Sequence, residues 1–352
     1  MTVTKALGIS FKLQEYFTLA NYEDKSWTLR GLVRMIPIFT CTAIAIFEIS
    51  VIFFIPRFPH VEDITIVSST VAKLDFVVNR LGLLLLFIMG FIRNSDHLNF
   101  YTYLLTLAKK LPIPVTDLKR RIFRNNVEIL FCLTINTAIT WVFFVIDSET
   151  YDFKAVIMHI IYIVTLCATD SFSMYIIYLY KEFSALGSRF RSREFSSGEE
   201  IASLTLLAEI LNIPVILNTA LGGLTFISVM QHLVCSSLTS YLIFWVFDMD
   251  MPPMVLVIYS LACFIWMSRS SACIIYLSIS GNDLSNEIQE LLKHINYIDE
   301  GTTDHCVLFN QDFTLLWSHH VERRIMAGSS IEINNSGIFS FVMLLLESRS
   351  QL

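Results

Sequence analysis

The stretch LGLLLLFIMGFI, residues 81–92, contains no charged side chain, and Arg93 follows it directly. Together with the more mixed residues 66–80, it is long enough for a helix that crosses the hydrocarbon layer, which takes about 20 residues. Connections that lie in the cytoplasm collect Lys and Arg. The pattern therefore predicts a membrane helix over residues 66–92 whose C-terminal end faces the cytoplasm.

Five further long apolar stretches and one short one have the same character. They run over residues 31–55, 126–146, 155–180, 214–247, 254–279 and, in the short case, 337–346. A chain with 54% hydrophobic and 16% charged residues is too apolar for an ordinary soluble domain. We therefore expect an all-α membrane protein with seven transmembrane helices. The short last span requires Ile331 and Ile333 to join it.

Helical extensions are predicted outside the spans. Apolar residues recur at helical spacing within residues 93–124, 200–211 and 288–298, the last of these inside a polar stretch over residues 282–332. The fifth span is longer than a bilayer requires, so its inner part is expected to project into the cytoplasm. These segments all belong to connections that carry basic residues, and we expect them to be cytoplasmic.

Basic residues follow an alternating pattern that predicts the orientation. The first, third and fifth connections contain only Arg57 and Lys154 between them, whereas the N-terminal arm and the even-numbered connections contain clusters. These clusters include Arg30, Arg34, Lys109, Lys110, Lys119, Arg120, Arg121, Arg124, Arg189, Arg191, Arg193, Lys293, Arg323 and Arg324. The N-terminus is therefore predicted to be cytoplasmic, and an odd number of spans places the C-terminus outside. This is the reverse of a G-protein-coupled receptor.

Motifs of soluble catalysis are absent from the sequence. No HExxH, P-loop or GxSxG pattern occurs, and the seven cysteines show no CxxC or CxxH spacing. His319 and His320 are adjacent, so on a helix they point in different directions and chelate poorly. We expect no enzyme, no cofactor and no metal site. The net charge of −6 gives no support for nucleic acid as a partner.

Charged side chains also occur inside the predicted spans, where each needs a partner or a watery cavity. They are Glu48, Lys73, Asp75, Arg80, Asp170 and Arg269. Their depths allow two ion pairs, Glu48 with Arg80 and Asp170 with Arg269. On one interpretation, such pairs have no role beyond fixing the packing of the helices. The alternative is that Arg80 and nearby polar groups line a ligand cavity open to the outside.

Aromatic residues gather in the outer halves of the spans. Trp and Tyr near helix ends are commonly interfacial anchors, but those that face the bundle interior can stack against a small organic ligand. The candidate ligand-binding residues are Arg80, Glu48, Trp141, His159, Tyr162, Tyr241 and Tyr259.

Two runs near the C-terminus carry a resemblance to a known family. They read WMSRSSACIIYLSISGNDLSNEIQELLKHI (266–295) and FNQDFTLLWSHHVERRIMAGSSIEINNSGIFSF (309–341). The chain resembles the arthropod gustatory receptors, the larger group that includes insect odorant receptors. That family has small residues at the inner end of span six, then an amphipathic Glu-Ile helix and a Gly-x-Phe turn, here Gly337 to Phe339. This chain departs from the family in its last span, where FVMLLLESRSQL stands in place of the family's Thr-Tyr and Gln-Phe signature.

The resemblance implies a ligand-gated, non-selective cation channel in the plasma membrane, assembled as a homo- or hetero-tetramer with related subunits. It implies a single receptor domain over residues 1–352, with a six-helix ligand-sensing bundle at 31–280 and an anchor helix plus pore-type last span at 305–352. Residues 309–325 are the expected anchor helix. The expected pore residues are Ser336, Gly337, Phe339, Ser340 and Met343. The expected partners are a small-molecule tastant and membrane lipid.

Two other classes of protein remain as alternatives. A G-protein-coupled receptor would require the opposite orientation, and neither Asp-Arg-Tyr after span three nor Asn-Pro-x-x-Tyr in span seven is present. A transporter would predict internal repeats and helices broken at the midplane, and the sequence shows no convincing repeat.

Overall fold

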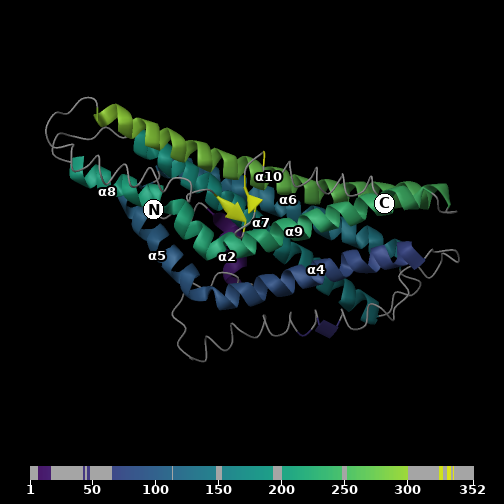
Figure 1. Ribbon diagram of the computed structural model, residues 1–352. Coiled ribbons are helices and arrows are strands. Elements are labelled where there is room, and N and C mark those ends of the chain that lie inside the picture. Colours follow the sequence, from purple (N-terminus) through teal and green to yellow (C-terminus); the bar gives the residue numbers. More distant parts are fainter. Residues whose placement is uncertain are drawn as a thin grey trace.

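In the computed structural model, the described residues are 7–16, 43, 46–47, 66–112, 114–147, 153–192, 200–247, 252–299, 325–327, 331–333 and 336. The described helices are α2 (Gly8–Tyr16), α4 (Ile66–Ile92), α5 (Asn94–Lys110), α6 (Val115–Asp147), α7 (Phe153–Arg191), α8 (Glu200–Leu211), α9 (Ile213–Val246) and α10 (Pro253–Asp299). Two short strands follow, β1 (Met326–Ala327) and β2 (Ile331–Glu332). The long helices run side by side as an elongated bundle (Figure 1).

Three described helices are long and apolar enough to cross a membrane: Tyr162–Arg191, Thr205–Val246 and Pro253–Lys293. A fourth crossing is possible if the bent pair Val77–Gly90 and Ser95–Lys110, which meet at 73°, counts as one span. The all-α, multi-pass membrane architecture is thus confirmed. The predicted bounds of α4 and α8 coincide with the observed ones. The last span, residues 337–346, and nearly all of the first lie outside the described residues.

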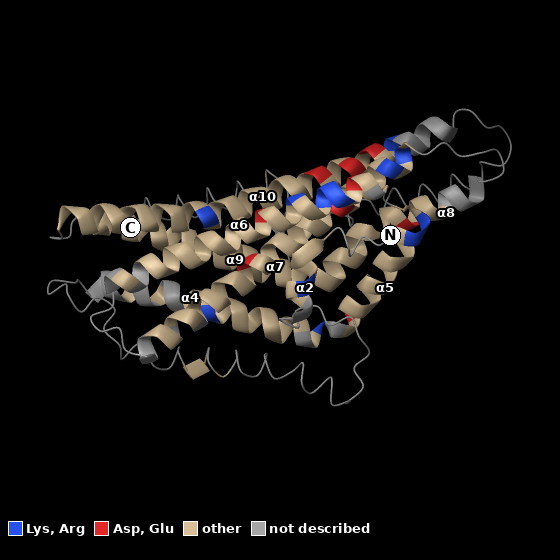
Figure 2. Cartoon of the chain, turned by 180° about the vertical axis from the view of Figure 1, so that it is seen from behind, with Lys and Arg blue, Asp and Glu red and all other residues tan. Residues whose placement is uncertain are grey.

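The longest helices extend well beyond a bilayer. α7 has 39 residues and α10 has 47, which at 1.5 Å per residue gives lengths of roughly 58 and 70 Å, against about 30 Å of hydrocarbon. The helical run predicted over residues 288–298 is present, and α10 continues into it from the sixth span without a break. Its apolar face persists through Leu284, Ile288 and Leu291, which are all buried. Charged side chains gather at this end of the bundle (Figure 2).

Helix α7 lies at the centre of the packing. It contacts α6, α10 and α2, while α9 packs between α10 and α4. By contrast, α4, α6 and α10 each expose a row of large apolar side chains. These include Leu81, Leu85, Ile88, Val127, Leu130, Phe131, Val257, Leu261, Phe264 and Ile275. An apolar outer surface, with charged side chains such as Arg80 and Asp170 kept in the interior, suits a bundle that is surrounded by lipid.

The N-terminal helix α2 enters the bundle rather than lying apart from it (Figure 1). The buried residues Leu7, Ser10, Phe11 and Gln14 recur at helical spacing and form its inner face. Gln14 Nε2 donates to Ser171 Oγ on α7 at 3.3 Å. Helix α2 is therefore held against the central helix α7.

The strands β1 and β2 form an antiparallel hairpin seated on α9 and α10. Met326 N–H donates to Asn218 Oδ1 of α9 at 3.0 Å. On α10, the absence of a side chain at Gly281 lets Ile333 approach, since a Cβ there would lie 2.7 Å from the Ile333 carbonyl oxygen. Ile331 and Ile333, which the short last span was said to require, lie instead in strand β2 and directly after it. Ile325 bonds Ile333 in the hairpin, and the rest of the expected anchor helix lies outside the described residues.

Candidate ligand-binding core

Two aromatic rings stacked on each other, with an arginine against the outer face of each, lie inside the bundle and come from three helices. The Arg80 guanidinium (α4) lies 4.6 Å from the centre of the Tyr162 ring (α7). The Tyr162 ring stacks on Trp266 of α10, with centroids 6.0 Å apart and planes 15° apart. The Arg269 guanidinium lies 4.4 Å from the centre of the Trp266 ring. We call these four residues the cation–aromatic stack, and all four are buried.

The stack forms because the helices present these side chains at helical spacing. Trp266 and Arg269 are three residues apart and so lie on one face of α10, where the guanidinium can cover the indole. A planar guanidinium is weakly hydrated and stacks on aromatic faces, with an attraction of about 2 kcal/mol when it is removed from water. The stack therefore accommodates two cations within an apolar bundle.

A buried carboxylate balances the charge of Arg269. Asp170 on α7 is fully buried, and its Oδ2 lies 3.5 Å from Arg269 Nη1. Asn136 on α6 bridges the pair: its Nδ2 donates to Asp170 Oδ2 at 2.8 Å, and its Oδ1 accepts from Arg269 Nη1 at 2.8 Å. The predicted Asp170–Arg269 ion pair is confirmed. The predicted partner of Arg80, Glu48, lies outside the described residues.

The predicted ligand-binding residues fall into separate groups. Arg80 and Tyr162 belong to the stack, and His159 lies against Tyr162, with ring centroids 6.3 Å apart, while its Nε2 bonds the Thr140 carbonyl. Tyr241 and Tyr259 come together in a second apolar cluster, beside Leu242, Val246 and Cys263.

Trp141 and Ser336 are not part of either group. Trp141 is 49% exposed on the outer surface of α6, which suits the anchor alternative. Ser336 is exposed, and Gly337, Phe339, Ser340 and Met343 lie outside the described residues, as does Glu48.

Several residues of this core were not singled out from the sequence. Trp266, Asn136, His232 and Cys273 all lie within it or beside it. The available signal was the spacing of Trp266, Arg269 and Cys273 at i, i+3 and i+7, which marks one face of a helix. That spacing selects a face, but it does not say which neighbouring helix the face meets.

A groove lined by charged residues lies away from the stack. It has a volume of about 790 Å³ and lies between the N-terminal half of α6 and α7. Its walls include Arg120, Arg121, Arg124, Lys181, Asp117, Glu128 and Glu182. Arg121 and Glu182 form an ion pair at 3.0 Å across it. Asp117, Arg120, Arg121 and Arg124 belong to the extension over residues 93–124 that is predicted to be cytoplasmic, whereas Glu128 lies at the start of the predicted third span.

No protein-family model matches the chain, and no curated protein matches it in sequence. Solved structures do match. The insect olfactory receptor OR5 from Machilis hrabei aligns with a TM-score of 0.64 and 11% identity, over 97% of this chain and 95% of that one. The same receptor in complex with eugenol aligns with a TM-score of 0.61 and 9% identity, over 96% of each chain. The chain therefore has the fold of an insect olfactory receptor over nearly its whole length.

Proposed function

We propose that this chain is a gustatory-type chemosensory receptor, a subunit of a ligand-gated, non-selective cation channel that detects a small organic tastant. The cation–aromatic stack carries the proposal. It gathers two guanidinium groups and two aromatic faces in the interior of a bundle that otherwise offers lipid an apolar surface.

The fold supports a chemosensory role. OR5, whose structure is similar over nearly all of this chain, has been solved in complex with eugenol, a small phenolic compound. Two aromatic rings and two cations favour ligands of a related chemical kind, which have a planar ring or several hydrogen-bond acceptors. The apolar surroundings favour uncharged, compact molecules.

The ligand site is proposed around Arg80, His159 and Tyr162, which lie together next to Trp266. Glu48, Trp141, Tyr241 and Tyr259 remain proposed contributors from the sequence. The proposed pore consists of Ser336, Gly337, Phe339, Ser340 and Met343 in the last span of each subunit of a homo- or hetero-tetramer. This segment contains no carbonyl-filter signature and no ring of strong charges, so we expect low ion selectivity.

Helix α10 offers a route from ligand to pore. It carries Trp266 and Arg269 of the stack and, further along, Gly281, against which Ile333 is seated. A ligand that fits one arrangement of the stack better than another shifts the population toward that arrangement. A displacement of α10 then reaches the hairpin, and the hairpin is followed directly by the proposed pore segment.

The test is whole-cell current during application of a tastant panel. The chain is expressed as it is, and also with its last span replaced by one that carries the family's Thr-Tyr and Gln-Phe signature. We expect ligand-evoked current at least with the replacement. Arg80→Gln should raise the half-maximal ligand concentration about tenfold, which corresponds to about 1.4 kcal/mol of binding.

The matched control is Arg93→Gln, which removes an exposed arginine just beyond the same helix. It should leave the half-maximal concentration unchanged. An equal shift for both variants would contradict a role of Arg80 in the ligand site. Responses that need G proteins and no current in either chain would contradict the channel itself.

A further inference from the structure

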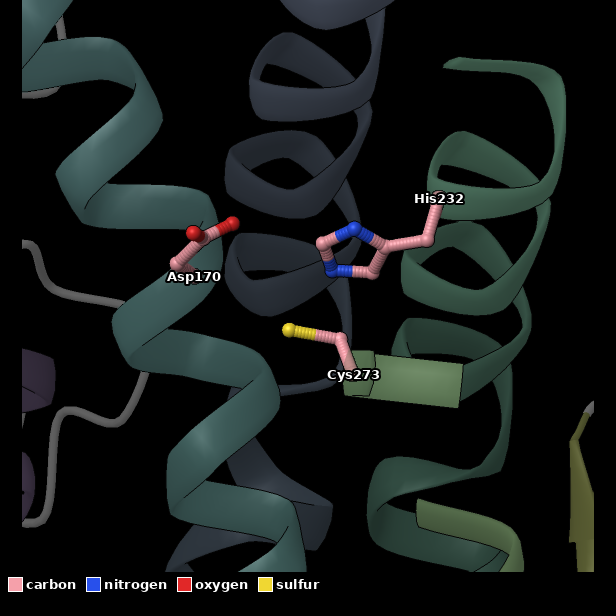
Figure 3. A group of neighbouring side chains, drawn as sticks. All are labelled: Asp170, His232 and Cys273. Carbon is pink, nitrogen blue, oxygen red and sulfur yellow. The ribbon is translucent and has the colours of Figure 1, made fainter. Parts of the chain in front are cut away.

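Three potential metal ligands converge beside the stack. Asp170 on α7, His232 on α9 and Cys273 on α10 are buried, and their ligand atoms lie within 4.8 Å of one another. Figure 3 shows the carboxylate, imidazole and thiol pointing toward a common space between their helices. The three residues are far apart in sequence, so motif spacing could not reveal them.

The two oxygens of Asp170 have different surroundings. Oδ2 accepts from Asn136, lies 3.5 Å from Arg269 Nη1 and is 3.5 Å from Cys132 Sγ. Oδ1 is buried and has no hydrogen-bond partner within the described part of the chain. A buried charged oxygen without a donor costs about 1–3 kcal/mol and requires an explanation. A cation on the Oδ1 side would supply one.

We propose that Asp170, His232 and Cys273 form a site for one divalent ion of the zinc type, and that Cys132, whose Sγ lies 3.5 Å from Asp170 Oδ2, turns in as fourth ligand. An oxygen, an imidazole nitrogen and sulfur ligands suit zinc, whereas Ca²⁺ and Mg²⁺ take oxygen ligands. In a tetrahedral zinc site the ligand atoms are roughly 3.3–3.8 Å apart, given bond lengths of about 2.0–2.3 Å. Because the ligand atoms of Asp170, His232 and Cys273 are at most 4.8 Å apart, side-chain rotations that close the widest separation by about 1 Å are sufficient for these three.

Neighbouring polar groups orient the ligands. Ser173 Oγ lies 2.9 Å from His232 Nε2 and 2.7 Å from Ser228 Oγ, so the imidazole is held through one of its nitrogens. Nε2 is also the nitrogen that faces Cys273 in Figure 3, so an ion bound there replaces the bond to Ser173, whose hydroxyl keeps Ser228 as its partner. Asn136 holds the Asp170 carboxylate through Oδ2. Such outer partners are typical of metal sites.

The charges of the proposed site balance. Asp170 and Arg269 already form a neutral pair. A divalent ion bound by neutral His232 and by the thiolates of Cys132 and Cys273 adds no net charge. Two bonds from sulfur to the metal form, and the two thiol protons pass to water. Insertion of the ion into the apolar bundle therefore leaves no uncompensated charge.

The test uses the full-length chain purified in detergent and titrated with Co²⁺, which reports thiolate ligation through an ultraviolet charge-transfer band. We expect one Co²⁺ per chain, displaced by Zn²⁺. Cys273→Ser and His232→Gln should weaken binding at least tenfold. Cys263→Ser is the matched control, because Cys263 is a buried cysteine on the same helix. It should leave binding unchanged.

A second measurement avoids dependence on folding of the variants. In the unsubstituted chain, Zn²⁺ should protect Cys132 and Cys273 from alkylation, as read by mass spectrometry, and leave the labelling of Cys263 unaltered. The absence of the charge-transfer band, an equal band in the folded Cys273→Ser variant, or equal labelling with and without Zn²⁺ would overturn the proposal.

Discussion

Replacement of Asp170 by Asn should destabilise the bundle through Arg269. The two charges are 3.5 Å apart, which corresponds to about 5 kcal/mol at an effective dielectric constant of about 20. The neutral amide of Asn also removes the cost of burying a carboxylate at this position, which returns about 2 kcal/mol. The expected net loss is about 3 kcal/mol, at the lower end of the range for breaking a buried ion pair.

The loss can be measured as a melting temperature by fluorescence-detected size exclusion, with a chelator present so that metal does not contribute. For 352 residues the unfolding entropy is about 0.7 kcal/mol/K, so 3 kcal/mol corresponds to about 4 °C. The control is Asp96→Asn, which breaks the exposed Arg93–Asp96 pair and should shift melting by less than about 1 °C.

A double variant tests whether the loss comes from the unpaired charge. Arg269→Gln alone should also lower the melting temperature, because it leaves Asp170 charged and buried. Asp170→Asn combined with Arg269→Gln removes both charges and should melt within about 2 °C of the unsubstituted chain, since most of the penalty is one of uncompensated charge. A double-variant shift equal to the sum of the two single shifts would refute the reasoning.

Four further predictions follow from specific contacts and from the orientation. Gly281→Ala places Cβ 2.6 Å from Ile333 Cγ2 and 2.7 Å from its carbonyl oxygen, so the hairpin must shift; evoked current should fall, and unchanged current would refute coupling through this contact. Gly82→Ala puts Cβ 2.3 Å from Oε1 of Gln231, a side chain whose Nε2 donates to Asn79 Oδ1. It should cost about 1–3 kcal/mol in thermal melting, more than Gly223→Ala, which meets the flexible end of Met89 at 3.0 Å. Trp266→Ala should cost about 3–5 kcal/mol in the same melting assay, and Trp266→Phe less because a ring remains against Tyr162; equal shifts would argue against stacking. An N-terminal epitope should stain only in permeabilised cells, and glycosidase treatment should not change the mobility of the chain through its sequon Asn334-Asn335-Ser336; staining of intact cells would reverse the orientation.

Periodicity and charge were sufficient to predict the long helices, but not which helices pack against one another. The bounds of α4 and α8 were predictable because apolar runs end where charged or turn residues begin. The continuity of α10 was not, since the residues from 282 onward form a polar stretch, whereas buried Leu284 and Ile288 keep the helix on its partners. The loss of a long apolar run at the surface does not end a helix whose inner face stays apolar.

The core was predictable only where depth alone decides the partner. Asp170 and Arg269 could be paired from their depths because each needs an opposite charge inside the membrane. The place of Trp266 between Tyr162 and Arg269 depends on how α7 and α10 are rotated about their axes. A single sequence gives no information on that rotation, so Trp266 on α10 and His232 on α9 were missed.

Helix α2 packs inside the bundle against α6 and α7. Its Gln14 touches Ser171, the residue next to Asp170, and Ile9 N–H bonds Asn126 Oδ1 on α6 at 2.8 Å. Deletion of the first sixteen residues would therefore remove buried contacts next to Asp170, and is expected to destabilise the bundle. Bulky fusion partners are accordingly better attached at the opposite terminus of the polypeptide.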